Sequence, residues 1–123
     1  DHYSSEANDR VFLAVQIESA TAVANAESIL STDGVDGCWV GPADMALTMG
    51  LTLNDIAVHH RHNEAVAHVV DTCQKLGKFA GYACSTIEMG KRRISEGFTF
   101  VNVGGDSMFI AEGSKRYLEE MRG

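Results

Sequence analysis

Four short segments rich in β-forming residues alternate along the chain with helical segments, and this rhythm limits the chain to a few folds. The predicted strands cover residues 11–17, 37–40, 79–84 and 98–103. The first of them, VFLAVQI, is almost continuously apolar, as in a strand that a parallel sheet buries on both faces. Because a helix follows each strand, the pattern implies right-handed βαβ units and a parallel sheet.

Two α/β architectures contain such a run of βαβ units. One is a small doubly wound sheet with helices on both faces. The other is a TIM barrel, in which eight βα units take about 250 residues, so that this chain would supply four of them as a half-barrel. The rhythm alone leaves both architectures open.

The helices are predicted over residues 20–32, 45–49, 63–76, 85–96 and 107–121. Ser19 can cap the first of them, Gly77 closes the third, and a capping-box pattern at residues 85–88 starts the fourth. Residues 51–62 are predicted to be a surface connection. The apolar side chains expected on the buried side of the last helix are Ile110, Tyr117, Leu118 and Met121.

The composition fits one globular domain over residues 1–123. Hydrophobic residues make up 45% of the sequence and charged residues 22%, with a single proline, which excludes a disordered or collagen-like chain. Ten Lys and Arg side chains against 17 Asp and Glu give a net charge of −7. A nucleic-acid partner is therefore not expected, and the acidic field favours small cations.

Three cysteines, Cys38, Cys73 and Cys84, form no Cys-x-x-Cys pair and are odd in number. This pattern argues against a disulfide framework and for a reducing cytoplasm, with the thiols acting as small buried apolar groups. No apolar run approaches the roughly 20 residues that span a bilayer, so no membrane partner is expected.

Two acidic residues lie just beyond the ends of neighbouring predicted strands. Glu18 directly follows the first strand, and Asp44 follows the second, behind the bend Gly41-Pro42. Ligands of parallel α/β folds bind at this edge of the sheet, where two carboxylates repel each other unless a cation or proton intervenes. Oxygen-only ligands suit Mg²⁺, Mn²⁺ or a similar divalent ion.

Each of these residues also has a plainer interpretation. Asp44 can be the N-cap of the short helical turn, and Glu18 can lie beside the dipole of the next helix. Gln16 shares a strand face with Glu18, where it is either a ligand contact or a polar residue satisfied inside a barrel. Taken singly, the plain interpretations are favoured for the two acids; taken together, the pair favours a metal site.

Residues 15–50, VQIESATAVANAESILSTDGVDGCWVGPADMALTMG, resemble the metal-dependent HpcH/HpaI aldolase family, which includes 4-hydroxy-2-oxoheptanedioate and 2-keto-3-deoxy sugar-acid aldolases. The family motif Val-Gln-x-Glu is matched by residues 15–18, and its Gly-Pro-x-Asp by residues 41–44. The segments GKFAGYA and FVNVGGDSMF are similar to the family's last two strands. The resemblance implies a half-barrel equivalent to the last four βα units of a TIM barrel.

The resemblance also implies a class II aldolase, a lyase that forms or cleaves a carbon–carbon bond between pyruvate enolate and an aldehyde in 4-hydroxy-2-oxoacid substrates. In this family the residues matching Glu18 and Asp44 hold a divalent metal such as Mg, Mn or Co, a Lewis acid that stabilises the enolate. The amides of Ala43 and Asp44 open a helix and can face the carboxylate of pyruvate. The residues expected to bind substrate are Gln16, Gly41, Ala43 and Asp44.

The acid/base and carboxylate-binding residues of such aldolases lie in the amino-terminal half of the barrel, so no catalytic residue is assigned in this chain. The chain starts at Asp1 rather than Met, which indicates residues upstream of it. One alternative is a catalytically incomplete half-barrel that binds divalent metal and pyruvate without turnover. Another is a doubly wound binding module in which Asp44 is only a cap.

The outer strands of a half-barrel, residues 11–17 and 98–103, expose edges that pair readily with another chain. We therefore expect a homo-oligomer, or association with the missing amino-terminal half. In the family the final helix often packs against a neighbouring subunit, and residues 107–121 are expected to do so here.

Two other polar segments have mainly structural interpretations. The histidines His59, His60 and His62 are expected to be solvated in a polar connection rather than to bind a metal. In the family a histidine at about the position of His62 precedes the same helix, and the resemblance implies a structural role for it. The segment Gly104-Gly105-Asp106 lies where barrels often bind phosphate, although a turn with an N-cap for the last helix explains it more simply.

Overall fold

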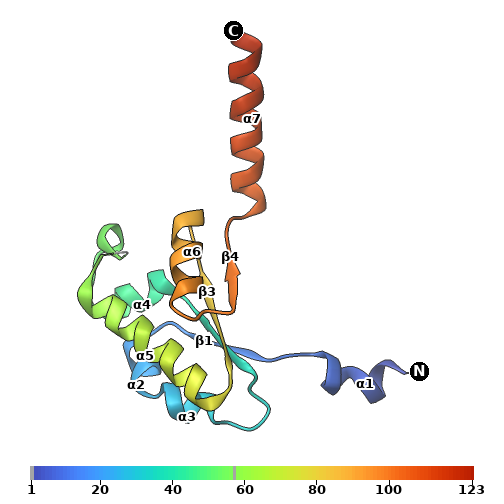
Figure 1. Ribbon diagram of the computed structural model, residues 1–123, viewed down its shortest axis with the longest axis vertical. Helices are drawn as coiled ribbons and strands as arrows, with labels where there is room; N and C mark the ends of the chain where they lie inside the picture. The colour runs from blue at the N-terminus through green and yellow to red at the C-terminus, as the bar shows by residue number, and fades with distance from the viewer. Residues whose placement is uncertain (1, 57) are drawn as a thin grey trace.

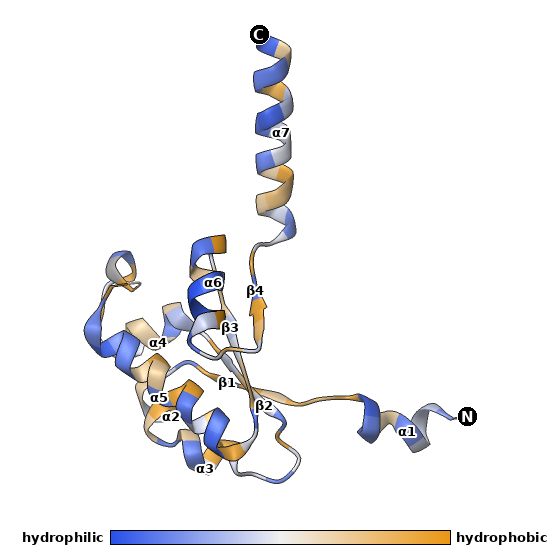
Figure 2. Ribbon diagram, viewed as in Figure 1, coloured by the Kyte–Doolittle hydropathy of each residue, from blue (hydrophilic) through white to orange (hydrophobic). Residues whose placement is uncertain are grey.

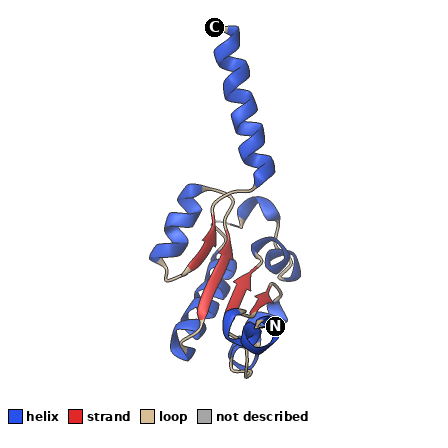
Figure 3. Cartoon of the chain, turned by 90° about the vertical axis from the view of Figure 1, so that its right-hand side faces the viewer, coloured by secondary structure: helices blue, strands red, loops and turns tan. Residues whose placement is uncertain are grey.

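The computed structural model describes residues 2–56 and 58–123, and in this part of the chain a four-stranded parallel sheet forms the centre (Figures 1 and 3). The spatial order of the strands follows the chain, β1-β2-β3-β4. A doubly wound sheet reverses its strand order at a switch point, whereas a barrel adds each strand beside the last. The βα units therefore form a half-barrel, as the resemblance implies. The strands are β1 (Ala14–Ile17), β2 (Gly37–Val40), β3 (Phe79–Ala83) and β4 (Phe100–Asn102).

The core lies on one face of the sheet, between the strands and the helices. The side chains of Ile17, Val40 and Tyr82 are fully buried there, because alternate residues of a strand point to the same face. The other face carries Gln16 and Phe100, both exposed. The prediction that residues 11–17 are buried on both faces is thus wrong within this chain.

The helices cover the buried face and extend beyond the sheet at both ends of the chain. They are α1 (Tyr3–Arg10), α2 (Ala20–Ala24), α3 (Ala26–Leu30), α4 (Pro42–Thr48), α5 (His60–Leu76), α6 (Ile87–Ser95) and α7 (Asp106–Arg122), with a 3₁₀ turn, η1, at Leu53–Asp55.

Local hydrogen bonds explain where several helices begin and end. The Ser19 hydroxyl accepts a hydrogen bond at 3.0 Å from the amide three residues on, which confirms the predicted start of the first helix. Gly77 ends α5 with φ 65°, a left-handed conformation that favours glycine, as predicted. The cap of α6 is Thr86, whose hydroxyl accepts from the Met89 amide at 3.1 Å. The capping box predicted at residues 85–88 is therefore wrong by one position.

Other helix boundaries also depart from the prediction. The sequence pattern contains no helix before residue 11, yet α1 forms there, and the first predicted helix splits at Asn25 into α2 and α3. α4 begins at Pro42 rather than residue 45, because the fixed φ of proline suits the first turn of a helix. α5 begins at His60 rather than residue 63, so part of the predicted surface connection is helical.

The last helix, α7, stands away from the sheet (Figure 1), and none of its residues is buried. The prediction that its apolar side chains are buried is therefore wrong within this chain; Ile110 is 68% exposed and Met121 is 85% exposed. The apolar residues remain visible as separate bands along a mostly hydrophilic helix (Figure 2). The helix has no partner among the described residues that could cover them.

The three cysteines lie in the core as predicted, and all are free thiols. The sulfur atoms of Cys38 on β2 and Cys73 on α5 are 3.5 Å apart. This contact and burial raise the pKa of the Cys38 thiol, so the group behaves as a protonated apolar side chain.

Among the described residues, the structure contains no helix with the length and apolar character that crossing a bilayer requires.

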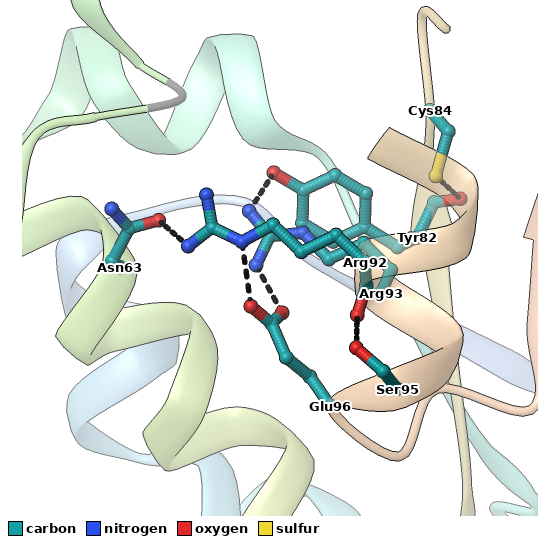
Figure 4. Close-up of polar contacts among 7 residues, drawn as sticks. All are labelled: Asn63, Tyr82, Cys84, Arg92, Arg93, Ser95 and Glu96. Atoms are coloured by element: carbon teal, nitrogen blue, oxygen red, sulfur yellow. Dashed lines mark hydrogen bonds and ion pairs between the residues drawn. The ribbon is translucent and has the colours of Figure 1, made fainter. Parts of the chain in front are cut away.

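A polar network buried against β3 holds α6 in place (Figure 4). The guanidinium of Arg93 is 2% exposed; it donates to the Tyr82 hydroxyl at 3.1 Å and to the Glu96 carboxylate at 2.5 Å. Arg92 binds the same carboxylate at 2.8 Å and donates to Asn63 of α5 at 3.3 Å. A buried charge is tolerated only when it is paired and hydrogen-bonded. Glu96 therefore holds the two arginines through which α6 contacts β3 and α5.

Replacing Glu96 with glutamine (E96Q) is expected to lower the free energy of unfolding by roughly 1.5–3 kcal/mol, because the buried Arg93 loses its charged acceptor. Urea denaturation of the purified chain measures the change. The control is E120Q, which removes the acidic partner of an exposed Arg116–Glu120 pair 3.9 Å apart and should cost less than about 0.5 kcal/mol. Equal effects of the two substitutions would contradict this role of Glu96.

The loss of stability caused by E96Q is expected to depend on pH. Burial alone would raise the pKa of Glu96, but hydrogen bonds from Arg92 and Arg93 outweigh burial and hold the pKa below its ordinary value of 4.5. The ionised carboxylate thus stabilises the fold fully above pH 4.5 and loses this effect as the pH falls through the lowered pKa. Urea denaturation at a series of pH values should therefore show that the difference in the free energy of unfolding between wild type and E96Q shrinks as the pH falls over that range.

Candidate functional site

The carboxylate of Glu18 lies where β1 and β2 end side by side. The strands pair in parallel with Ile17 opposite Val40, and the Gly41 amide continues this pairing by donating to the Ile17 carbonyl at 3.3 Å. Glu18 is partly buried, and the Gln16 side-chain amide donates to its Oε2 atom at 2.5 Å. Gln16 therefore fixes the direction of one acid that the sequence assigns to a metal.

Gly41 is required here by close approach rather than by backbone conformation. Its φ of −94° is accessible to any residue, but a Cβ atom at this position would lie 2.7 Å from Oε2 of Glu18 and 2.9 Å from the Glu18 Cβ. A side chain at residue 41 would thus displace Glu18 or the loop. The structure brings Gln16, Glu18 and Gly41 together at the ends of β1 and β2.

Asp44 occupies the first turn of α4, three residues after Gly41. The N-cap of α4 is Gly41, so the interpretation of Asp44 as the N-cap is wrong. The Asp44 side chain is exposed, and no described residue donates a hydrogen bond to it or forms an ion pair with it. An acid in this position has no structural partner and is available to a ligand.

The start of α4 also presents unpaired backbone donors. The Met45 amide makes the first helical hydrogen bond, to the Gly41 carbonyl at 3.0 Å. Pro42 has no N–H, and the amides of Ala43 and Asp44 donate to no described residue. Because the N-cap is glycine, no side chain satisfies them. These donors point from the start of a helix, where anions are favoured.

The loop after β1 is tied to α4 at a second point. The Ala20 amide donates to the Thr48 hydroxyl at 3.0 Å, and that hydroxyl in turn donates to the Met45 carbonyl at 2.9 Å. Met45 and Ala46 are fully buried and anchor α4 in the core. The two segments that carry Glu18 and Asp44 are therefore held together at both ends of α4.

A histidine from α5 contacts the same segment. His62 is fully buried, and its Nε2 atom lies 3.2 Å from the Pro42 carbonyl oxygen. The expectation of a solvated histidine in a polar connection is wrong for His62. Its position was readable, because His62, Ala65, Val66 and Val69 recur at the spacing of one helix face and are all buried.

The structure also describes two further polar segments that the sequence analysis considers. In the part of the chain that is described, no group of three or more His, Cys, Asp or Glu side chains is arranged to hold a metal ion. Gly105, not Asp106, is the N-cap of α7, and the Asp106 carboxylate accepts from the neighbouring Ser107 amide at 2.7 Å.

The donor set at the strand ends fits a hard divalent cation. Glu18 and Asp44 offer carboxylate oxygens without a competing basic side chain among the described residues. Mg²⁺ and similar ions need few protein ligands, because water and substrate oxygens complete their coordination. A groove of about 330 Å³ adjoins the start of α4, lined by Pro42, Ala43, Leu53, Asn54, Ile56, Ala83, Ser85 and Met89.

Comparison with known proteins identifies the family of the chain. Residues 3–112 match the model of the HpcH/HpaI aldolase/citrate lyase family. The chain is 34% identical over 118 residues to 2-keto-3-deoxy-L-rhamnonate aldolase of Klebsiella pneumoniae subsp. pneumoniae, covering 96% of this chain and 43% of that protein. It is 35% identical to 4-hydroxy-2-oxo-heptane-1,7-dioate aldolase of Salmonella arizonae, covering 92% of this chain and 42% of that protein.

Solved structures show the same relationship. A HpcH/HpaI aldolase/citrate lyase family protein from Burkholderia cenocepacia J2315 superposes with a TM-score of 0.88 and 31% identity, over 99% of this chain and 47% of its own. The chain thus spans less than half the length of these relatives and corresponds to the carboxy-terminal half of their barrel. The predicted resemblance is confirmed: the chain belongs to the HpcH/HpaI aldolase/citrate lyase family.

Proposed function

We propose that this protein is a class II aldolase that forms or cleaves a carbon–carbon bond between pyruvate enolate and an aldehyde, with 4-hydroxy-2-oxoacids as substrates. The observation that carries the proposal is the position of the Glu18 carboxylate, oriented by Gln16 and seated against Gly41 at the start of the segment that carries Asp44. The aldolases among the relatives support the same reaction class.

Glu18 and Asp44 would hold a divalent cation in this proposal, with Mg, Mn or Co as candidates. When bound, such a cation supplies Lewis-acid stabilisation of negative charge that develops on the substrate. The protein's own part is orientation: Gln16 fixes Glu18, and buried Met45 and Ala46 fix the turn that carries Asp44. Preorganised ligands of this kind avoid reorganisation during the reaction.

The substrate would bind beside the same segment. The unpaired amides of Ala43 and Asp44 suit the carboxylate of pyruvate. Gln16 and Gly41 both lie beside the Oε2 atom of Glu18. The groove next to Pro42 and Ala43 has the volume of a small-molecule site. The aldehyde would enter from this side.

The proton-handling residues of the reaction are not assigned to this chain. We propose that they come from the amino-terminal half of the barrel. The free, buried thiols of Cys38, Cys73 and Cys84 favour a reducing compartment such as the cytoplasm for this assembly.

Removal of either carboxylate is expected to weaken metal binding. Isothermal titration calorimetry with Mn²⁺ should give dissociation constants at least about tenfold higher for E18Q and for D44N than for wild type. Removal of an outer-shell partner already weakens metal binding by this factor, and removal of a ligand should weaken it at least as much. D71N, which changes an exposed acid on α5, is the control and should bind as wild type does. Unchanged binding in both E18Q and D44N would refute the metal site.

Turnover is expected to depend on the cation. With pyruvate release from a 4-hydroxy-2-oxoacid as the assay, EDTA should abolish activity and excess Mn²⁺ or Mg²⁺ should restore it. Activity that survives EDTA would show that the proposed mechanism is wrong. Metal binding without turnover in this chain would favour the incomplete half-barrel, and addition of the amino-terminal half then tests whether activity returns.

The open face of the sheet is expected to be covered in solution. Phe12, Phe79 and Phe100 contact one another there with ring centroids 5.2–6.2 Å apart, and Phe12 remains 58% exposed. Size-exclusion chromatography with light scattering should therefore show self-association of the 123-residue chain, which F100D should weaken. A clean monomer for wild type would contradict this expectation.

A further inference from the structure

One buried contact connects the longest core helix to the candidate metal centre. His62 of α5 lies 20 positions from Pro42 in the sequence, and its Nε2 atom is 3.2 Å from the Pro42 carbonyl oxygen. Pro42 is the first residue of α4, and Asp44 is two residues further on. The contact therefore acts on the same helical turn that presents the proposed metal ligand.

The chemistry of the contact fixes the form of the imidazole. A carbonyl oxygen can only accept, so Nε2 must carry the proton and donate. The opposite nitrogen, Nδ1, is buried and has no hydrogen-bond partner in the described structure. Protonation of Nδ1 would charge the ring and leave a buried N–H without an acceptor, which costs more than leaving the Nδ1 lone pair unpaired. Neutral His62 with the proton on Nε2 is therefore the stable form.

The surroundings of His62 favour the same form. Burial lowers the pKa of His62; the hydrogen bond to the Pro42 carbonyl opposes this effect, and the positive charge of Arg93 adds to it. Arg93 is itself held in place by Tyr82 and Glu96. The donor toward Pro42 is thus present over the neutral pH range without a change of charge.

The segment that receives this hydrogen bond needs external support. α4 has seven residues, which is too short to be stable alone, and its first turn has a glycine N-cap without a side-chain bond. Met45 and Ala46 anchor the side of α4 that faces the core. Among the side-chain hydrogen bonds of the described residues, the one from His62 reaches the first turn of α4, at the segment Gly41-Pro42-Ala43.

We propose that His62 is a positioning residue of the metal centre, which holds the Pro42 carbonyl and thereby sets the direction in which Asp44 is presented. This inference rests on the proposed cation site at Glu18 and Asp44. His62 touches neither cation nor substrate; it acts through the backbone of Pro42. It also accounts for a fully buried histidine beside Ala65, Val66 and Val69 on one face of α5.

The test compares two amides that differ in reach. In H62Q the side-chain amide can occupy the place of Nε2 and donate to Pro42, whereas in H62N it ends near the place of Nδ1 and falls short. Mn²⁺ titration of the full chain is the first readout, and the electron paramagnetic resonance spectrum of bound Mn²⁺ is the second. The titration should show about 10–100-fold weaker binding for H62N and binding within about threefold of wild type for H62Q. H68Q, at an exposed histidine of the same helix, is the control and should bind as wild type does.

Each outcome decides the proposal. Loss in H62N with rescue in H62Q supports it. Wild-type affinity in H62N, or an equal loss in both variants, overturns it and leaves the cation site standing; a wild-type chain that binds no Mn²⁺ overturns the cation site and this inference together. If H62N fails to fold in the absence of metal, H62L, which removes the donor but keeps the core apolar, takes its place in the same comparison.

Discussion

The parallel pairing of β1 with β2 is the interaction on which the candidate site depends. It puts Ile17 opposite Val40, so that Glu18 and Gly41 leave the sheet at the same edge. The Glu18 carboxylate then occupies the volume in which any Cβ at residue 41 would lie. A register shift of one residue would turn the Glu18 side chain to the opposite face. Strand register and site geometry are therefore a single property of this fold.

One face of the same sheet is packed against helices, and the other face is open to solvent. Its helix-covered face buries Ile17, Val40 and Tyr82 completely, whereas the inner face leaves aromatic rings such as Phe100 in contact with solvent. In a closed barrel the inner face is packed with side chains. The half-barrel thus contains its own core, whereas the face that lies inside a closed barrel is left uncovered by the described residues.

The sequence predicts this fold well where its signals are local and periodic. β2 is predicted with the bounds that it has, and the Val-Gln-x-Glu and Gly-Pro-x-Asp motifs place Glu18 and Asp44 at adjacent strand ends. It fails where tertiary contacts decide. The helical spacing of His62 to Val69 marks a buried face, but the acceptor, Pro42, is known only once α5 lies against α4. Likewise, the apolar residues of α7 indicate a buried face, but none of its residues is buried by the described part of the chain.

Charge links the fold to the proposed chemistry. Among the described residues, Glu18 accepts a hydrogen bond only from the neutral Gln16, and the Arg93 guanidinium is committed to Glu96. No basic side chain therefore offsets the repulsion between carboxylates at the strand ends, and a divalent cation would do so. Because such an ion binds the assembled site and not the unfolded chain, at a concentration 100 times its dissociation constant it adds about 2.7 kcal/mol to stability. The proposed ion would then also stabilise the edge of the sheet that binds it.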